Sequence, residues 1–430
     1  MTTSEMFQEF LENLKITNSE QISNRYGEIT AALNKKFRDT ESKTANTLQV
    51  GSYGRWTGIN GISDLDMLYI MPKTKWDDYK EGKQEKLLSD TRQAIKDRYP
   101  STTVKVSGLV VQVQYQNFQV EVQPVFEQDD GSFKYPHTRN GGEWKITKPK
   151  DEIAAMKEFV DQKNKNLRRL CKMARAWKNK SGVVMGGLLI DTLSHNFLKS
   201  TDQYDSKSYG SYDQLAKDFF EYLENEPEKE FYAALGSGQR VNVKKKFQGK
   251  AKKARKLCQE AIDAESSELA SEKWRQIFGR NFPLVEEESK DEALSKSLFG
   301  WRNTEEFIED KFPIDIQYEL RIECEVSQNG FRENLLRKML ANRIPLLANK
   351  KLLFQVMETN TPEPYFVYWK VLNRGAEAKR RDCIRGQIIS DDGFEKRKES
   401  TNFRGAHLVE CYIVQYAVVV ARDAIDVPIQ

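Results

Sequence analysis

Apolar residues recur at helical intervals near the start of the chain and then give way to the alternation typical of β-strands. Residues 1–15 and 21–38 carry an apolar residue every three or four positions, which predicts two amphipathic helices. A polar stretch follows, and then strands alternate with one further helix, at 83–99. The predicted strands cover 47–50, 65–71, 103–115 and 118–126, with a hairpin connection at Gln116 and Asn117. This order of elements predicts a small mixed sheet backed by helices.

The middle of the chain has a helical pattern and the end has a strand pattern. The segment 129–150 is rich in glycine, proline and polar residues, which predicts a long loop. Helices are expected over 151–179, 183–198, 212–225 and 244–278. An acidic, serine-containing stretch at 286–295 predicts a linker. Beyond it, a separate β-rich domain is expected, with strands at 316–326, 352–357, 365–372, 383–389 and 409–420.

The composition is that of a folded protein with a sizeable core. Of 430 residues, 39% are hydrophobic and 31% are charged, which argues against wholesale disorder. The formal net charge is only +4, so any basic surface must be local. The lysine-rich run at 244–256 is interpreted as a solvated helix face, with nucleic-acid binding as the open alternative.

The chain shows no signal for a membrane or for secretion. No apolar run approaches the roughly 20 residues needed to cross a bilayer, so no membrane partner is expected. Residues 1–15 lack the basic start and continuous apolar stretch of a secretory signal, which predicts a cytoplasmic protein. Five cysteines are scattered singly, as expected of reduced, buried thiols. Because the chain has only three histidines, acidic residues are the expected ligands of any metal.

A glycine–serine turn followed by two closely spaced aspartates is the most informative motif. Gly51 and Ser52 end one predicted strand, and Asp64 and Asp66 begin the next. Side chains two residues apart on a strand share a face, so the two carboxylates project together and repel one another unless a cation lies between them. Oxygen-rich acidic sites suit Mg²⁺, and the turn offers backbone N–H groups and a hydroxyl to a triphosphate.

A third carboxylate, Glu121, lies between two valines of the strand at 118–126. If the valines face the core, Glu121 faces the same side as the aspartates. Three carboxylates around two metal ions are the equipment for in-line phosphoryl or nucleotidyl transfer, which needs no protein nucleophile. The alternatives are that Asp64 and Asp66 are ordinary surface residues and that Glu121 faces water from an edge strand.

These motifs together resemble a known signature. Gly51-Ser52, followed after eleven residues by Asp64-Leu65-Asp66-Met67, is similar to the signature of the DNA polymerase beta-like nucleotidyltransferases. More narrowly, the segments 51–71, 119–126 and 141–144 resemble the bacterial cyclic-oligonucleotide synthases (CD-NTases), relatives of cyclic GMP-AMP synthase in the antiphage operons called CBASS. The resemblance covers about residues 1–290. One departure is Glu121, where many members carry Asp; the carboxylate is kept on a longer side chain.

The resemblance implies roles for individual residues. It implies two Mg²⁺ ions, with Mn²⁺ as the alternative, on the catalytic residues Asp64, Asp66 and Glu121. It implies that the donor triphosphate is bound by Gly51 and Ser52 and by a cation on the helix at 167–180, where the candidates are Lys172 and Arg175. An ordinary solvated basic helix is the alternative for these two cations. Trp144 is expected either to contact a base or to anchor the loop that contains it.

The C-terminal block resembles the AGS-C sensor domain found at the end of such nucleotidyltransferases. The likeness spans about residues 296–430 and rests on the segments 368–378, 384–387 and 405–412. It implies an activating ligand, which the sequence does not identify. Candidate contacts are Lys370, Arg385 and Arg404 for an anion and Trp369 or Tyr412 for a base, each equally interpretable as a satisfied sheet residue. His407 is expected to be structural.

The sequence therefore predicts an α+β fold with a DNA polymerase beta-like core at 1–150, a helical half at 151–295 and the sensor domain at 296–430. The expected function is Mg²⁺-dependent joining of nucleoside triphosphates, ATP or GTP or others, into a cyclic di- or trinucleotide second messenger. That product would act on a separate effector protein in antiphage defence. The rival functions are synthesis of a linear oligonucleotide or RNA tail, and non-catalytic sensing of a nucleotide or RNA.

Overall fold

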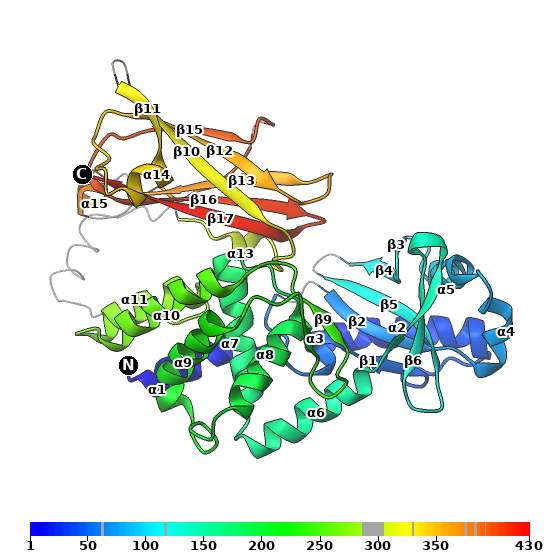
Figure 1. Ribbon diagram of the computed structural model, residues 1–430. Coiled ribbons are helices and arrows are strands. Elements are labelled where there is room, and N and C mark those ends of the chain that lie inside the picture. The colour runs from blue at the N-terminus through cyan, green and yellow to red at the C-terminus, as the bar shows by residue number, and fades with distance from the viewer. Residues whose placement is uncertain are drawn as a thin grey trace. The chain divides into compact units, whose positions relative to one another are not determined.

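The structure is a computed structural model that describes most of the chain in two compact units (Figure 1). The first unit comprises Met1–Trp177 and Met185–Leu284, and the second comprises Lys178–Val184 and Val285–Gln430. The described residues are 1–61, 64–115, 118–285, 305–328, 331–373, 376–381, 385–391 and 393–430. The predicted linker at 286–295, the connection at Gln116 and Asn117, and Cys383 lie outside these residues.

A mixed sheet forms the centre of the first unit, as the sequence predicts. Its strands follow the order β1-β2-β5-β4-β3, and β6 and β7 extend it from β5. Only β2 and β5 pair in parallel, whereas the other neighbours pair antiparallel. The strands are β1 (Thr47–Gln49), β2 (Asp64–Ile70), β3 (Thr103–Ser107), β4 (Val110–Gln114), β5 (Gln119–Glu127), β6 (Phe133–His137) and β7 (Glu143–Thr147).

Two helices cover one face of this sheet. They are α2 (Ser19–Arg38) and α5 (Gln84–Arg98). Ile29 of α2 and Leu87 of α5 belong to one buried cluster with Leu65 and Met67 of β2. Because strand side chains alternate between faces, the residues between these apolar positions point to the opposite face. That opposite face carries the predicted carboxylates.

The rest of the first unit is helical. Phe7 and Phe10 of the N-terminal helix contact the rings of Trp274, Phe278 and Phe282, so the two ends of this unit share one aromatic core. A short hairpin of β8 (Phe231–Ala233) and β9 (Arg240–Asn242) interrupts the helices. The helices are α1 (Thr3–Asn13), α3 (Gly51–Gly54), α4 (Trp76–Tyr79), α6 (Pro149–Gln162), α7 (Asn166–Ser181), α8 (Gly187–Lys199), α9 (Tyr212–Asn225), α10 (Gln248–Ile262) and α11 (Ser267–Phe278).

The second unit is a pair of four-stranded antiparallel sheets with short helices, which confirms the β-rich C-terminal region. Their inner faces share one buried cluster, with Phe354 from one sheet and Trp369 and Cys411 from the other. The first sheet has the order β11 (Phe331–Leu335), β10 (Leu320–Gln328), β12 (Lys351–Thr359), β15 (Lys396–Ser400). The second has the order β14 (Ile388–Ser390), β13 (Phe366–Leu372), β16 (Gly405–Gln415), β17 (Val418–Ile429). The helices are α13 (Ile308–Lys311), α14 (Leu336–Ala341) and α15 (Ala376–Arg380).

Several predicted elements are divided in the structure by tight turns. The strand expected at 103–115 is two strands, because Gly108 takes a positive φ of 59° between them. The helix expected at 151–179 is α6 and α7, separated where Asn164 and Lys165 adopt φ of 48° and 65°. The strand expected at 409–420 is similarly divided into β16 and β17.

Two further predictions differ from the structure. The long loop expected at 129–150 contains the β6–β7 hairpin, and the helix expected at 244–278 is divided into α10 and α11. Among the described residues, no helix combines the length and the apolar character that a membrane span requires.

Candidate active site

Asp64 and Asp66 project together from β2, as the alternation predicts. Both are half-buried, whereas Leu65, which lies between them, and Met67, which follows Asp66, are fully buried. The carboxylates therefore lie on the face of the sheet opposite α2 and α5. This arrangement lets two acidic groups remain accessible on a strand whose other face is core.

Parallel pairing brings Glu121 of β5 to the same place. Asp66 aligns with Glu121, and Asp64 aligns with Gln119. The Gln119 amide nitrogen Nε2 donates to Asp64 Oδ1 at 2.7 Å and to Glu121 Oε1 at 3.3 Å. Gln112 of β4 donates to the same Glu121 oxygen at 2.9 Å. One face of three adjacent strands thus gathers the three predicted carboxylates and two neutral amides.

The donor chemistry of this face fits a hard divalent cation, which prefers carboxylate oxygens. The side chains of Asp64 and Glu121 share one amide donor, so their oxygens lie within reach of a single small group. Nevertheless, in the described part of the chain no three His, Cys, Asp or Glu side chains are arranged to hold a metal ion together. The structure thus brings the three carboxylates to one face, with hydrogen bonds from glutamine amides.

Gly51 lies directly against Asp66. It takes a φ of +64°, and a Cβ at this position would be 1.8 Å from Asp66 Oδ2. The backbone N–H of Val50 also donates to the Asp66 carbonyl oxygen at 3.1 Å. Only glycine permits both the backbone conformation and the close approach of the carboxylate. The turn of α3, with Ser52 half-buried in it, is therefore held next to the carboxylate face.

A buried ion cluster, absent from the sequence-based hypothesis, fixes the other side of this turn. Asp191 of α8 is 0% exposed and accepts hydrogen bonds from Arg55 Nε at 2.8 Å and Thr57 Oγ1 at 3.0 Å. Arg175 of α7 binds the same carboxylate through both terminal nitrogens, at 2.6 and 3.1 Å. Burial by itself would raise the pKa of Asp191, but the charges of Arg175 and Arg55 outweigh it and lower the pKa to about 2.

This cluster changes the interpretation of Arg175. Its guanidinium is buried and bonded to Asp191 and to the carbonyl oxygens of Cys171 and Gly187, so it acts as a structural cation. The prediction of Arg175 as a triphosphate contact is therefore not supported by its surroundings, because a buried, fully engaged guanidinium is not presented to a ligand.

Lys172 has a different environment from Arg175. It is half-buried, and burial lowers its pKa, followed by the charges of Lys15, Arg168 and Arg175. A lysine among several cations marks a locally positive surface. Arg168 in turn lies over the exposed ring of Trp56, 4.6 Å from its centroid. The role of Lys172 as the cation that binds the donor triphosphate thus stays a prediction.

The sequence held two signals for the cluster. Arg55 and Thr57 follow the glycine–serine motif within five residues, and Asp191 is the single acidic residue of the apolar helix α8. An acidic side chain on an otherwise apolar helix needs a buried cation, because an isolated buried carboxylate is costly. The pattern predicts that a partner exists, but not that two arginines from distant segments supply it.

Trp144 makes several contacts that anchor its strand, β7. Its Nε1 donates to the Lys80 carbonyl oxygen at 3.0 Å, and its ring lies 4.9 Å from that of Trp76 and 5.7 Å from that of Phe126. It belongs to the predicted loop region, which the structure resolves as a hairpin. These contacts fit the alternative that Trp144 is an anchor. Its ring partners, Trp76 and Phe126, are aromatic residues that pack on the sheet.

The predicted contacts of the C-terminal domain divide into buried and accessible groups. Trp369 and Tyr412 are 2% and 1% exposed, so their rings are core and are not available for stacking. Lys370 is buried and paired with Glu305 at 2.8 Å. Arg385 forms a bidentate pair with Glu399. His407 lies near the Phe403 carbonyl oxygen at 3.3 Å, in agreement with a structural role.

The lysine-rich segment 244–256 lies partly before α10 and partly on it, and several of its cations have acidic neighbours. Arg255 and Lys252 pair with Glu224 at 2.6 and 3.5 Å, and Lys246 pairs with Glu228 at 2.6 Å. Exposed pairs of this kind stabilise a surface only slightly.

Comparisons with known proteins match both parts of the chain. Residues 1–159 match the Second Messenger Oligonucleotide or Dinucleotide Synthetase domain, and residues 302–430 match the Adenylyl/Guanylyl and SMODS C-terminal sensor domain. None of the curated proteins compared with the chain matches it.

Several solved structures are similar to part of this chain at low sequence identity. The CdnC protein of E. coli MS115-1, solved with a truncated HORMA partner, is 14% identical with a TM-score of 0.50, over 65% of this chain and 98% of that one. The Vibrio cholerae dinucleotide cyclase DncV is 13% identical, with a TM-score of 0.48 over 65% of this chain and 87% of that one. The Elizabethkingia meningoseptica cyclic dinucleotide synthase CdnE is 16% identical, with a TM-score of 0.43 over 61% of this chain and all of that one.

Proposed function

Because this chain is a nucleotidyltransferase of the second messenger oligonucleotide or dinucleotide synthetase family with a C-terminal sensor domain, we propose that it joins nucleoside triphosphates into a cyclic oligonucleotide. The observation that carries the proposal is the alignment of Asp66 with Glu121 on adjacent parallel strands, with Asp64 on the same face and Gly51 against Asp66. This arrangement places three acidic groups beside a turn that suits phosphate oxygens.

In the proposed reaction, a ribose hydroxyl of one nucleotide attacks the α-phosphorus of another. A phosphodiester bond forms, the bond to pyrophosphate breaks, and the hydroxyl proton is released; a second round closes the ring. Divalent metal, Mg²⁺ or Mn²⁺, would supply charge neutralisation and a lowered hydroxyl pKa when bound by Asp64, Asp66 and Glu121. Gly51 and Ser52 would orient the donor phosphates, and Lys172 would bind their outer oxygens.

The Asp191 cluster would act by holding the turn. Arg55 and Thr57 lie three and five residues after Ser52, and their bonds to Asp191 would restrict the backbone that carries the phosphate donors. A site that is fixed before the substrate arrives gains rate because less ordering remains for the reaction step. Asp191, Arg55 and Arg175 are thus positioning residues in this proposal.

The finer assignments belong to the same proposal. The catalytic core would span 1–150, the helical half 151–295 and the sensor domain 296–430. The product would act on a separate effector protein in the cytoplasm, within antiphage defence. The substrates would be ATP, GTP or other nucleoside triphosphates, since the turn and the carboxylates would contact the triphosphate and not the base.

The test is product analysis with the full chain. The purified protein would be incubated with four labelled nucleoside triphosphates and Mg²⁺, and the products treated with phosphatase and weighed by mass spectrometry. A cyclic product keeps its mass under phosphatase because it has no terminal phosphate, whereas a linear oligonucleotide loses the mass of its 5′ phosphates. Asp64→Ala with Asp66→Ala should abolish the product, and the exposed Asp202→Ala should not. Synthesis that persists in the double variant contradicts the assignment.

A further inference from the structure

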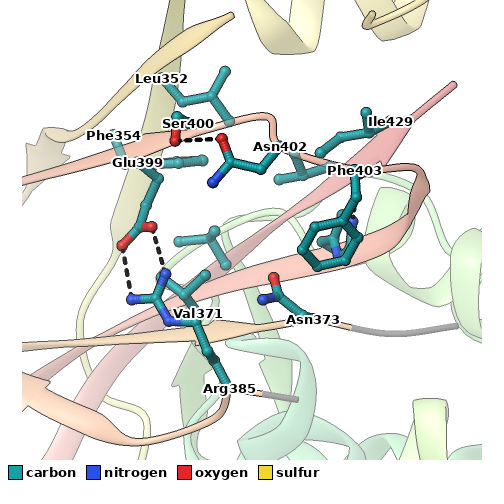
Figure 2. Close-up of a pocket in the computed structure, with 13 residues that line it drawn as sticks. Leu352, Phe354, Val371, Asn373, Arg385, Glu399, Ser400, Asn402, Phe403 and Ile429 are labelled. Atoms are coloured by element: carbon teal, nitrogen blue, oxygen red, sulfur yellow. Dashed lines mark hydrogen bonds and ion pairs between the residues drawn. The ribbon is translucent and has the colours of Figure 1, made fainter. Parts of the chain in front are cut away.

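A cavity of about 140 Å³ lies inside the second unit, between its two sheets (Figure 2). Its walls are apolar and come from both sheets: Phe354 of β12 faces Val371 of β13, Val409 of β16 and Val427 of β17. These side chains belong to or border the buried cluster that joins the sheets. The cavity is therefore a place where the two layers do not fill the space between them, although a packed core normally leaves few voids.

Polar groups surround the opening of this cavity. Figure 2 shows Asn402 between the strands, Phe403 and Asn373 together at one end, and Arg385 with Glu399 at the other. Ser400 Oγ donates to Asn402 Oδ1 at 2.9 Å, which orients the amide. The opening thus combines an aromatic ring, two carboxamides and a hydroxyl.

The loop that carries Asn402 and Phe403 is fixed by the buried Thr401. Thr401 Oγ1 donates to the Leu347 carbonyl oxygen at 3.0 Å and accepts from the Lys350 N–H at 2.7 Å. Backbone bonds between residues 349–350 and Thr401 add to this anchor. Because the anchor holds the segment that carries Ser400, Asn402 and Phe403, this side of the cavity is formed before any ligand enters.

The charged groups of the opening are already compensated. Glu399 accepts from Arg385 at 2.7 and 3.2 Å and from Arg397 at 2.9 Å. Burial lowers the pKa of His407, so its ring is neutral near pH 7. An anion would have to displace Glu399 from its arginines, whereas an uncharged ring would not.

We propose that this cavity binds the flat heteroaromatic ring of a nucleobase, with the sugar left at the opening. An apolar cavity of roughly 150 Å³ is large enough for one benzene molecule, which sets the size of the guest at a single compact ring system. Apolar walls accept the faces of the ring, and asparagine amides suit the paired donors and acceptors of a base edge. The proposal does not depend on the synthase reaction.

The test uses the full chain and uncharged nucleosides, which lack the triphosphate that the carboxylate site is proposed to hold. Adenosine, guanosine, cytidine, uridine and thymidine would each be titrated and followed by saturation-transfer NMR and thermal unfolding. At least one nucleoside should bind and raise the unfolding midpoint. Asn402→Ala should weaken that binding about tenfold, as expected for one lost hydrogen bond. Val371→Phe should abolish it by filling the cavity.

The control is Phe394→Ala in the same unit, since Phe394 is 77% exposed and lies outside the cavity. Its affinity for the nucleoside should equal that of the parent chain. If the circular dichroism spectrum shows that Val371→Phe is unfolded, the Asn402→Ala variant alone tests the proposal. Asn402 is exposed, so its replacement should leave the fold intact. The proposal is overturned if no nucleoside binds at millimolar concentration. It is equally overturned if binding is unchanged in Asn402→Ala but lost in Asp64→Asn with Asp66→Asn, which would place the nucleoside at the synthase site.

Discussion

Two groups of carboxylates in the first unit differ in how their charge is balanced. Asp64, Asp66 and Glu121 are half-buried, and the bonds to Asp64 and Glu121 described above come from neutral glutamine amides. Asp191 is fully buried and is held by two guanidinium groups. A metal cation can readily replace neutral hydrogen-bond donors at a carboxylate, whereas it cannot readily replace a buried pair of arginines. The first group is thus suited to chemistry and the second to structure.

The two groups meet at one turn. Asp66 lies against Gly51, and Asp191 binds Arg55 and Thr57 only a few residues later. The segment proposed to bind phosphate is therefore held from both sides, by one accessible and one inaccessible carboxylate. If this comparison is right, substitutions in the two groups should separate loss of activity from loss of stability.

The largest effect on stability is expected from Asp191→Asn. It removes the acidic partner of the buried Arg175 and leaves Arg55 with Glu152 alone, at 3.2 Å. Breaking a buried ion pair in this way typically costs about 3–5 kcal/mol of unfolding free energy. Urea unfolding followed by circular dichroism measures it. Asp64→Asn, at the accessible face, should change the same free energy by less than about 1 kcal/mol. Equal losses in the two variants would remove the distinction between the groups.

Gly51→Ala should impair activity more than stability. The new Cβ would lie 1.8 Å from Asp66 Oδ2, so the carboxylate and the turn must move apart. Displacement by about 1 Å commonly lowers a rate about a hundredfold. Steady-state kinetics would measure the loss. Gly61→Ala is the matched control. Gly61 also has a positive φ, of 77°, but no atom of the described residues lies within 4 Å of a Cβ built there, so the rate of this variant should stay near that of the parent.

Asp191 should contribute to the loss of unfolding free energy as the pH becomes acidic. Its folded pKa of about 2 lies below the usual value of 3.8, so the contribution is complete above pH 4 and is lost as the pH falls from about 4 to 2. A shift of nearly two pKa units corresponds to about 2 kcal/mol. Urea unfolding of the parent and of Asp191→Asn at pH 5 and pH 3 tests it. The difference between the two proteins should narrow at the lower pH, and a constant difference would contradict the assignment.

The smallest effect is expected from Lys172→Ala. One charge-assisted hydrogen bond to a phosphate contributes about 1.5 kcal/mol or more, so kcat/KM should fall about tenfold. Stability should be unchanged, in contrast to Arg175→Ala, which removes a buried partner of Asp191. The exposed Lys253→Ala serves as the control. If Lys172→Ala has the kinetics of Lys253→Ala, Lys172 does not contact substrate.

The accessible carboxylates were predictable from sequence because they obey a local rule. Alternation along β2 and β5 places Asp64, Asp66 and Glu121 on the face opposite the buried valines and leucines. The buried cluster was not predictable, because Asp191 is 136 residues from Arg55 along the chain and no local pattern encodes that contact. For the same reason Arg175 was predicted as a triphosphate contact or a solvated residue, and its buried pairing with Asp191 was not foreseen.

The divided elements follow a similar rule. The breaks at Asn164 and Lys165 and at Tyr416 and Ala417 occur at non-glycine residues with positive φ. Of these residue types only asparagine commonly adopts that conformation, so Lys165, Tyr416 and Ala417 give no sequence signal of a turn. Periodicity therefore located the longer helices and strands, but it missed the β6–β7 and β8–β9 hairpins and the points where elements end.

Binding of Mn²⁺ tests the central claim most directly. The full chain would be titrated with Mn²⁺ in the presence of a non-hydrolysable nucleoside triphosphate, and bound ion measured by electron paramagnetic resonance. The account predicts that the parent chain binds the ion, that Asp64→Asn with Asp66→Asn loses it, and that Asp202→Asn, whose side chain is 96% exposed, retains it. Undiminished binding in the double variant would show that the metal and the nucleotide lie elsewhere, which would contradict the account.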